Sequence, residues 1–131
     1  MASRVSVLDG TIRALGAEMG PWNDMDVAMA YPGDMNAEHD AVREAVGMWD
    51  TSALKKIWVR GPDACAALDY LVTRDMNKLY IGKSAYVPIL QDNGHFCDDG
   101  FIFHFEEDVY LAVTSIGPTL EYLQSWSKGR N

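Results

Sequence analysis

Two adjacent carboxylates, Asp98 and Asp99, stand inside an aromatic stretch, residues 95–105 (HFCDDGFIFHF). Side chains alternate between the two faces of a strand, so both carboxylates cannot face solvent. A carboxylate on an apolar face either receives hydrogen bonds or loses its charge, because its desolvation costs several kcal/mol. Such a group can position or protonate a ligand, or it can accept backbone N–H groups at a bend. Gly100 fits both interpretations, since glycine marks bends and also lets a flat ligand approach the backbone.

Two other kinds of chemistry are weaker candidates in the same stretch. His95, Cys97 and Asp99 share a face at spacing i, i+2, i+4, but no second cluster supplies further metal ligands. Cys97 with His95 could form a thiol nucleophile pair, but no orienting group or oxyanion loop accompanies them. We therefore expect no metal site and no thiol catalysis.

The hairpin that contains this stretch decides where the two carboxylates point. Asn93-Gly94 lies between two apolar runs and predicts a two-residue type I′ turn, which requires positive φ at both positions. A loop one residue longer would introduce a bulge and could exchange the faces of the carboxylates. Counting outward from the two-residue turn pairs Leu90 with Cys97, Pro88 with Asp99, and Tyr86 with Phe101.

This register places Asp99 on an aromatic face, diagonal to Tyr86 and within its reach, while Asp98 points the other way. We expect one face to carry Tyr86, Pro88, Leu90, Cys97, Asp99, Phe101, Phe103 and Phe105. We expect the other face to carry Val87, Ile89, Asp98, Gly100, Ile102 and His104.

The elements that must position these residues follow an α+β pattern. Periodicity predicts a weak helix over 3–19, an irregular connection with a short strand over 20–35, and a helix over 36–46 capped by Asn36. Further on come a strand at 55–60, a helix capped by Asp63, strands at 84–90, 95–105 and 109–114, and a final helix after 117–118 (Gly-Pro). We expect a single domain, residues 1–131, with helices packed on an antiparallel sheet.

Composition narrows the class of protein. A chain of 131 residues with 48% hydrophobic and 23% charged residues is typical of a globular domain. The net charge of −8 and the single basic cluster, Lys55, Lys56 and Arg60, argue against nucleic-acid binding. Cys65 and Cys97 form no metal or disulfide motif. With neither a signal peptide nor an apolar run of roughly 20 residues, we expect a soluble, cytoplasmic protein and no membrane segment.

Seven fragments occur in the order and near-constant spacing of a known family: LGAEMGPWNDMDVAMAYP, EHDAVREAVGMWDTS, VRGPDA, LVTRDMNKL, GKSAYVPIL, DNGHFCDDG and VYLAVTS. In that order the chain resembles the folate-dependent aminomethyltransferase family, which includes the glycine-cleavage T-protein. The resemblance covers roughly residues 14 to 126. It implies the N-terminal part of the aminomethyltransferase fold and tetrahydrofolate as cofactor.

The resemblance also implies roles for single residues. Asp99, the second Asp of the pair, corresponds to the acid that lies beside the folate's reactive nitrogens and handles protons. Tyr86 corresponds to a tyrosine that lines the folate cleft, and Thr114 takes the place of a folate-contacting asparagine. We expect Phe101 and Trp49 to add apolar lining to that cleft.

Two departures from the family pattern bear on the substrate. The family's D-V-S-H-M-G reads DTSALK at residues 50–55, so its histidine is missing, and Thr114 replaces the asparagine. These changes resemble relatives that take a methyl or one-carbon group from N-methyl amines, dimethylsulfoniopropionate or methoxylated aromatics. We expect a small N-, O- or S-methyl compound as the donor.

Family members are much longer and carry further acidic and arginine folate contacts in their later part. The start at Met1 and the polar tail SKGRN favour a natural small subunit. We therefore expect an enzyme that is active only with a second subunit carrying the rest of the fold. The alternatives are a non-enzymatic folate-binding or assembly module and a half-domain that serves only as scaffold.

Overall fold

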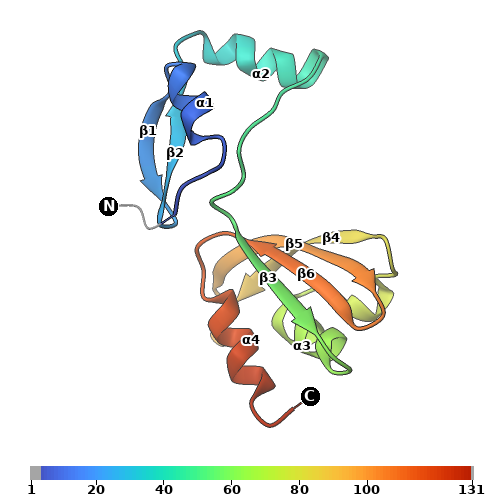
Figure 1. Ribbon diagram of the computed structural model, residues 1–131. Helices are drawn as coiled ribbons and strands as arrows, with labels where there is room; N and C mark the ends of the chain where they lie inside the picture. Colours follow the sequence, from blue (N-terminus) through green and yellow to red (C-terminus); the bar gives the residue numbers. More distant parts are fainter. Residues whose placement is uncertain (1–3, 131) are drawn as a thin grey trace. The chain divides into compact units, whose positions relative to one another are not determined.

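The computed structural model describes residues 4–130. Contacts divide the chain into two compact units, Met1–Ala53 and Leu54–Asn131 (Figure 1). The single domain over residues 1–131 stays a prediction from the sequence. Within residues 4–130, no helix is both long and apolar enough to cross a membrane.

The first unit contains a short helix and a β-hairpin. Helix α1 (Asp9–Ala14) is much shorter than the helix predicted over 3–19, of which residue 3 lies outside the described residues. The chain leaves the helix at Gly16, whose φ of 80° suits glycine, and continues into β1 (Glu18–Trp22) and β2 (Met25–Ala30). Asn23 and Asp24 form the turn with φ of 49° and 61°, as a type I′ turn requires. The sequence predicts a largely irregular connection here, because Asn-Asp is a weaker turn signal than Asn-Gly.

Helix α2 (Met35–Glu44) closes the first unit. Asp34 is its N-cap, since the Asp34 carboxylate accepts a hydrogen bond from the Asn36 N–H at 2.9 Å. The predicted cap at Asn36 is therefore wrong, and the helix ends two residues earlier than predicted. No residue of α2 is buried, and its apolar residue Val42 is exposed.

The second unit is built on an antiparallel sheet of four strands. Their order is β3 (Lys55–Arg60), β6 (Val109–Thr114), β5 (Phe96–Glu106) and β4 (Ser84–Leu90). Helix α3 (Ala64–Leu71) starts directly after Asp63, a 3-10 turn η1 (Met76–Lys78) precedes β4, and α4 (Thr119–Ser127) follows β6. The predicted α+β class with an antiparallel sheet and packed helices is confirmed.

Helices α3 and α4 cover one face of this sheet (Figure 1). Leu68 of α3 and Leu123 of α4 pack there against Val87, Ile89 and Ile102 of the strands. Burying a side chain of this size stabilises the fold by roughly 1.5–3 kcal/mol. The opposite face carries aromatic side chains that stay partly exposed, so alternation along the strands separates a covered face from an open one.

Candidate functional site

The turn of the β4–β5 hairpin is one residue longer than predicted. The Gln91 N–H donates to the His95 carbonyl at 2.8 Å, and the Gly94 N–H donates to the Gln91 carbonyl at 2.8 Å. Gly94 has a φ of 81°. This is the three-residue loop in which a turn is followed by a left-handed residue, and not the two-residue type I′ turn.

A bulge at Cys97 compensates for the longer turn. Leu90 pairs with Phe96, so the predicted partner Cys97 is wrong, and the next pair is Ile89 with Asp98. The extra residue in β5 cancels the extra residue in the loop. Beyond the bulge, the predicted pairs are confirmed: Pro88 with Asp99, and Tyr86 with Phe101.

The bulge changes the surroundings of Cys97. Cys97 packs partly buried against the helix-covered core and not with the aromatic side chains, so its predicted face is wrong. Its thiol donates to the Ile89 carbonyl at 3.5 Å, and burial raises the pKa of the thiol, which disfavours the reactive thiolate. Among residues 4–130, no group of three His, Cys, Asp or Glu side chains is arranged to hold a metal.

Tyr86 and Asp99 meet on the open face of the sheet. The Tyr86 hydroxyl donates a hydrogen bond to Asp99 Oδ2, and the rings of Tyr86 and Phe101 lie 5.3 Å apart. The bond to Asp99 raises the pKa of the Tyr86 phenol above its ordinary value, and desolvation and the carboxylate charge act in the same direction. The predicted proximity of Asp99 to Tyr86 is thus confirmed.

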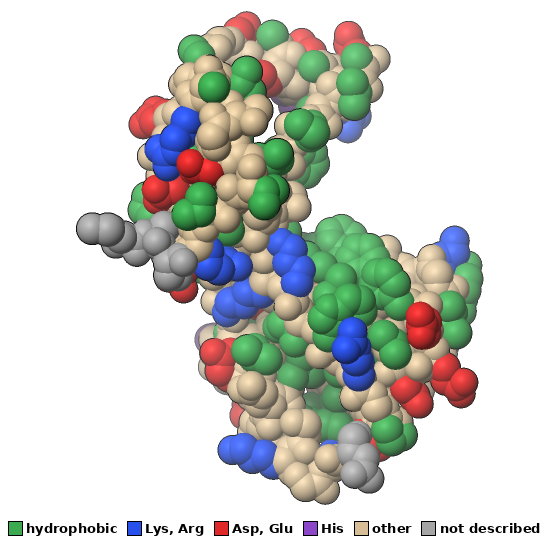
Figure 2. Space-filling model, viewed as in Figure 1, with side chains coloured by type: hydrophobic (Ala, Val, Ile, Leu, Met, Phe, Trp, Pro, Cys, Tyr) green, Lys and Arg blue, Asp and Glu red, His purple; other side chains and the backbone are tan. Residues whose placement is uncertain are grey.

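A row of aromatic side chains runs from this pair along β5 and ends at β3. Phe103 lies 6.2 Å from Phe101 and 6.4 Å from Phe105, and Phe105 lies 5.4 Å from Trp58 of β3, as ring centroids. The Arg60 guanidinium lies 4.6 Å from the centre of the Trp58 ring. Figure 2 shows hydrophobic side chains gathered over the sheet of this unit. Such an exposed aromatic surface is typical of a binding site.

Asp98, and not Asp99, is the buried carboxylate. Only 3% of Asp98 is exposed, and it lies on the face covered by the helices. Its Oδ2 accepts from Thr119 Oγ1 at 2.7 Å, and its Oδ1 accepts from the N–H groups of Asp99 at 3.0 Å and Ser115 at 3.2 Å. The structural role that the sequence left open for Asp99 is therefore filled by its neighbour.

Glycine is required at position 100 for a reason that the sequence did not predict. A Cβ at Gly100 would lie 2.2 Å from the Val113 carbonyl oxygen, so the missing side chain admits strand β6 and not a ligand. Thr114, the partner of Gly100 in β6, is fully buried on the helix-covered face. The structure therefore places Thr114 on the opposite side of the sheet from Tyr86 and Asp99.

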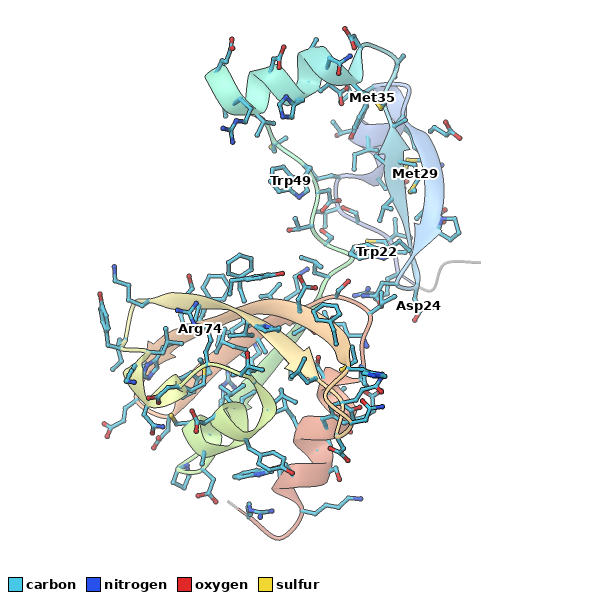
Figure 3. The ribbon with its side chains drawn as sticks, turned by 180° about the vertical axis from the view of Figure 1, so that it is seen from behind. Trp22, Asp24, Met29, Met35, Trp49 and Arg74 are labelled. Carbon is cyan, nitrogen blue, oxygen red and sulfur yellow. The ribbon has the colours of Figure 1, made fainter. Side chains whose placement is uncertain are left out.

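Trp49 belongs to the first unit, where its side chain is exposed (Figure 3). The site described from the second unit does not include it.

Two residues of that site were missed: Trp58, which alternation along β3 directs to the open face, and Arg74. Arg74 Nη1 donates to the Tyr86 carbonyl at 3.2 Å, so Tyr86 is held at its backbone and at its hydroxyl. No pattern within the strand sequence pointed to Arg74, which precedes η1 (Figure 3).

The chain is similar to proteins of known family. Residues 8–129 match the family model described as the GCVT N-terminal domain. The chain is 38% identical over 127 residues to the heme-dependent oxidative N-demethylase gamma subunit of Ectopseudomonas mendocina, covering 97% of this chain and 34% of that protein. It is 39% identical over 127 residues to an aminomethyltransferase of Koribacter versatilis, covering 95% of this chain and 33% of that protein.

The fold agrees with these sequence matches. The crystal structure of the glycine cleavage system aminomethyltransferase T from Bartonella henselae superposes with a TM-score of 0.79 at 24% identity. It covers 96% of this chain and 36% of the other. The chain thus spans about a third of the length of the relatives it matches. The chain belongs to the aminomethyltransferase family and corresponds to its N-terminal part.

Proposed function

We propose that this chain contributes the Tyr86–Asp99 pair to a tetrahydrofolate site in a one-carbon transferase or demethylase. The observation that carries the proposal is the hydrogen bond from the Tyr86 hydroxyl to Asp99 Oδ2 on an exposed aromatic face. Membership of the aminomethyltransferase family supports the reaction class. Asp99 would be the working acid, and Tyr86 and Phe101 would form the wall beside it.

The residues present suit a reduced folate. A pteridine is flat and presents N–H donors. The Tyr86 and Phe101 rings provide an aromatic surface for it, since Tyr86 is 51% exposed and Phe101 is 46% exposed. The Asp99 carboxylate keeps acceptor capacity beyond its bond to Tyr86, because a carboxylate has about four acceptor positions. Tetrahydrofolate, when bound, would supply the nitrogen that accepts the carbon unit.

Within this site, Asp99 would orient the bound N–H groups and hold or release a proton close to the reacting nitrogen. Tyr86 would fix the carboxylate by donating to one of its oxygens, which leaves the other for a ligand. Arg74 would assist indirectly by holding the Tyr86 backbone. Thr114 faces the core and Trp49 lies in the first unit, so neither carries the proposal.

A partner polypeptide is the second part of the proposal. The chain covers only 33% to 34% of the length of the two relatives described above, one of which is named as a gamma subunit of an N-demethylase. We therefore propose a heteromer in which another chain carries the remaining part of the fold. The name of that relative and the departures at residues 50–55 favour a small N-, O- or S-methyl compound as donor.

The test uses the complex co-purified from its native host through a tag on this chain. Asp99→Asn is expected to lower the rate of tetrahydrofolate-dependent one-carbon transfer by about 10²-fold or more, because it removes the acid–base group. Asp92→Asn is the matched control, since Asp92 is an exposed acid in the turn of the same hairpin. Its rate should stay at the wild-type value.

Three results would contradict parts of the proposal. Near-normal turnover of a folded Asp99→Asn complex would remove Asp99 from the mechanism. Folate binding without transfer from any methyl donor would favour the non-enzymatic binding or assembly module. A stable, folate-binding monomer of this chain alone would argue against the heteromer.

A further inference from the structure

We propose that Asp98 is a positioning residue, whose buried carboxylate sets the backbone of Asp99 and thereby the Asp99–Tyr86 contact on the opposite face. The inference rests on the proposed function in one respect: Asp99 is taken as the working acid. Its structural basis is independent, because it depends only on contacts within the second unit.

The β5–β6 ladder stops just short of Asp99. Its last pair is Gly100–Thr114, so no residue of β6 is paired with Asp99. The N–H of Asp99 therefore takes an acceptor from outside this ladder.

The Asp98 carboxylate provides that acceptor. Asp98 Oδ1 receives the Asp99 N–H at 3.0 Å and the Ser115 N–H at 3.2 Å, and so bridges β5 and the chain after β6 where the ladder stops. A carboxylate that is only 3% exposed can remain in place because each of these bonds offsets its desolvation. Asp98 thus continues the pairing by one step with its side chain.

The second oxygen connects this bridge to helix α4. Asp98 Oδ2 accepts from Thr119 Oγ1 at 2.7 Å, and Thr119 is the first residue of α4 and fully buried. A negative charge at a helix N-terminus is favourable, because the helix dipole is positive there. The position of the carboxylate is therefore fixed by a rigid element as well as by the strand.

The loop between β6 and α4 is shaped to receive this carboxylate. A Cβ at Gly117 would lie 2.6 Å from Asp98 Cγ and 2.7 Å from Asp98 Oδ2, so only glycine allows the approach. Lys55 Nζ holds the same loop from β3 by donating to the Gly117 carbonyl at 2.9 Å. Loop, helix and strand meet at Asp98.

Asp98 acts on the open face through the single peptide unit that joins it to Asp99. Neighbouring side chains in a strand point to opposite faces, so a shift of the backbone at Asp99 moves its carboxylate relative to Tyr86. Displacements of about 1 Å in a catalytic group are enough to lower a rate by up to about 10²-fold. A residue that only stabilised α4 would leave the Tyr86–Asp99 contact unchanged.

The test reads that contact directly in the full-length chain. Tyrosines carrying ¹³C at Cζ report phenol ionisation by NMR, Tyr86→Phe assigns the Tyr86 signal, and Asp99→Asn gives its titration without the partner. Thr119→Val is the main variant, because it removes the donor to Asp98 without changing any charge. Thr119→Ser is the matched control, since it keeps the hydroxyl.

We expect the pH midpoint of the Tyr86 titration in Thr119→Val to move from the wild-type value toward the value in Asp99→Asn. The midpoint in Asp98→Asn should move in the same direction. Thr119→Ser should titrate like the wild type. In the assembled complex, Thr119→Val should lower kcat about tenfold while the KM for folate stays within about twofold.

Wild-type Tyr86 titration in a folded Thr119→Val chain would overturn the proposal. Should Asp98→Asn fail to fold, Thr119→Val decides alone. Should the complex have no folate-dependent activity, the proposed function fails, but the Tyr86 titration still supports or overturns the positioning role of Asp98.

Discussion

Asp98 and Asp99 are neighbours in the chain, yet their carboxylates lie on opposite faces of the same sheet. Asp98 is buried and bonds Thr119, whereas Asp99 bonds the hydroxyl of the half-exposed Tyr86. One face is covered by helices and the other is open and aromatic. The two acids therefore differ in their surroundings: Asp98 bonds backbone N–H groups in the core, and Asp99 stays partly exposed beside Tyr86.

Tyr86→Phe tests the contact between the phenol and Asp99. The substitution removes the donor and keeps the ring beside Phe101, so the tilted ring contact is retained. We expect kcat/KM of the assembled complex to fall about three- to tenfold, because Asp99 loses one orienting bond. Tyr80→Phe, at another exposed tyrosine of the same unit, is the control and should have no effect. An unchanged kcat/KM for Tyr86→Phe would show that Asp99 does not depend on this bond.

Stability should fall in alkaline solution through buried tyrosine. Burial is the largest cause that raises the pKa of Tyr110, and interaction with Cys65 adds to it. The folded chain then keeps a phenol proton that the unfolded chain has lost. This stabilisation is complete below the ordinary tyrosine pKa of about 10 and is lost as the pH rises above it.

Urea unfolding between about pH 8 and about pH 11 measures this effect. The free energy of unfolding of the wild type should decrease as the pH rises. The free energy of unfolding of Tyr110→Phe should decrease less steeply. The hydrogen bond to Asp99 raises the pKa of Tyr86, and burial raises the pKa of Tyr122, so both act with the same sign. Equal slopes for Tyr110→Phe and the wild type would contradict the role of Tyr110.

Gly100→Ala should destabilise the second unit. The new Cβ would lie 2.2 Å from the Val113 carbonyl and 3.0 Å from Thr114 Cα, so the strands must separate. Overpacking of this kind costs about 1–3 kcal/mol. Gly10→Ala is the contrasting variant: a Cβ there meets nothing within 4 Å, and helix α1 should gain up to about 1 kcal/mol. Thermal unfolding of both variants measures the difference, and equal stabilities would contradict the strand-packing role of Gly100.

Leu68→Ala tests the packing of α3 on the sheet. Leu68 is fully buried in the core cluster, so its truncation should lower the free energy of unfolding by about 2–5 kcal/mol. Leu120→Ala, at a 40% exposed leucine of α4, should cost less than about 1 kcal/mol. Denaturant unfolding distinguishes the two. A small effect for Leu68→Ala would indicate that α3 is not part of the cooperative core.

The strands of the second unit, their antiparallel pairing and the proximity of Tyr86 to Asp99 were all predictable from the sequence. Local rules were sufficient for this, because alternation and the counting of pairs from a turn do not require distant contacts. The same rules leave the loop length open: the loop is one residue longer, and the bulge at Cys97 keeps the two carboxylates on their predicted faces. The hairpin of the first unit depends on an Asn-Asp turn, which is a weaker sequence signal than Asn-Gly.

Which face of the sheet is covered depends on long-range packing. Each face of β5 carries at least one large apolar side chain, Ile102 on one and Phe101, Phe103 and Phe105 on the other, so alternation separates Asp98 from Asp99 without saying which is buried. That choice depends on where α3 and α4 pack, and on Thr119 and Ser115, which reach Asp98 from positions far along the chain. The burial of Thr114 has the same origin. Local sequence sets the two faces of a strand, and long-range packing assigns one to the core and leaves the other exposed.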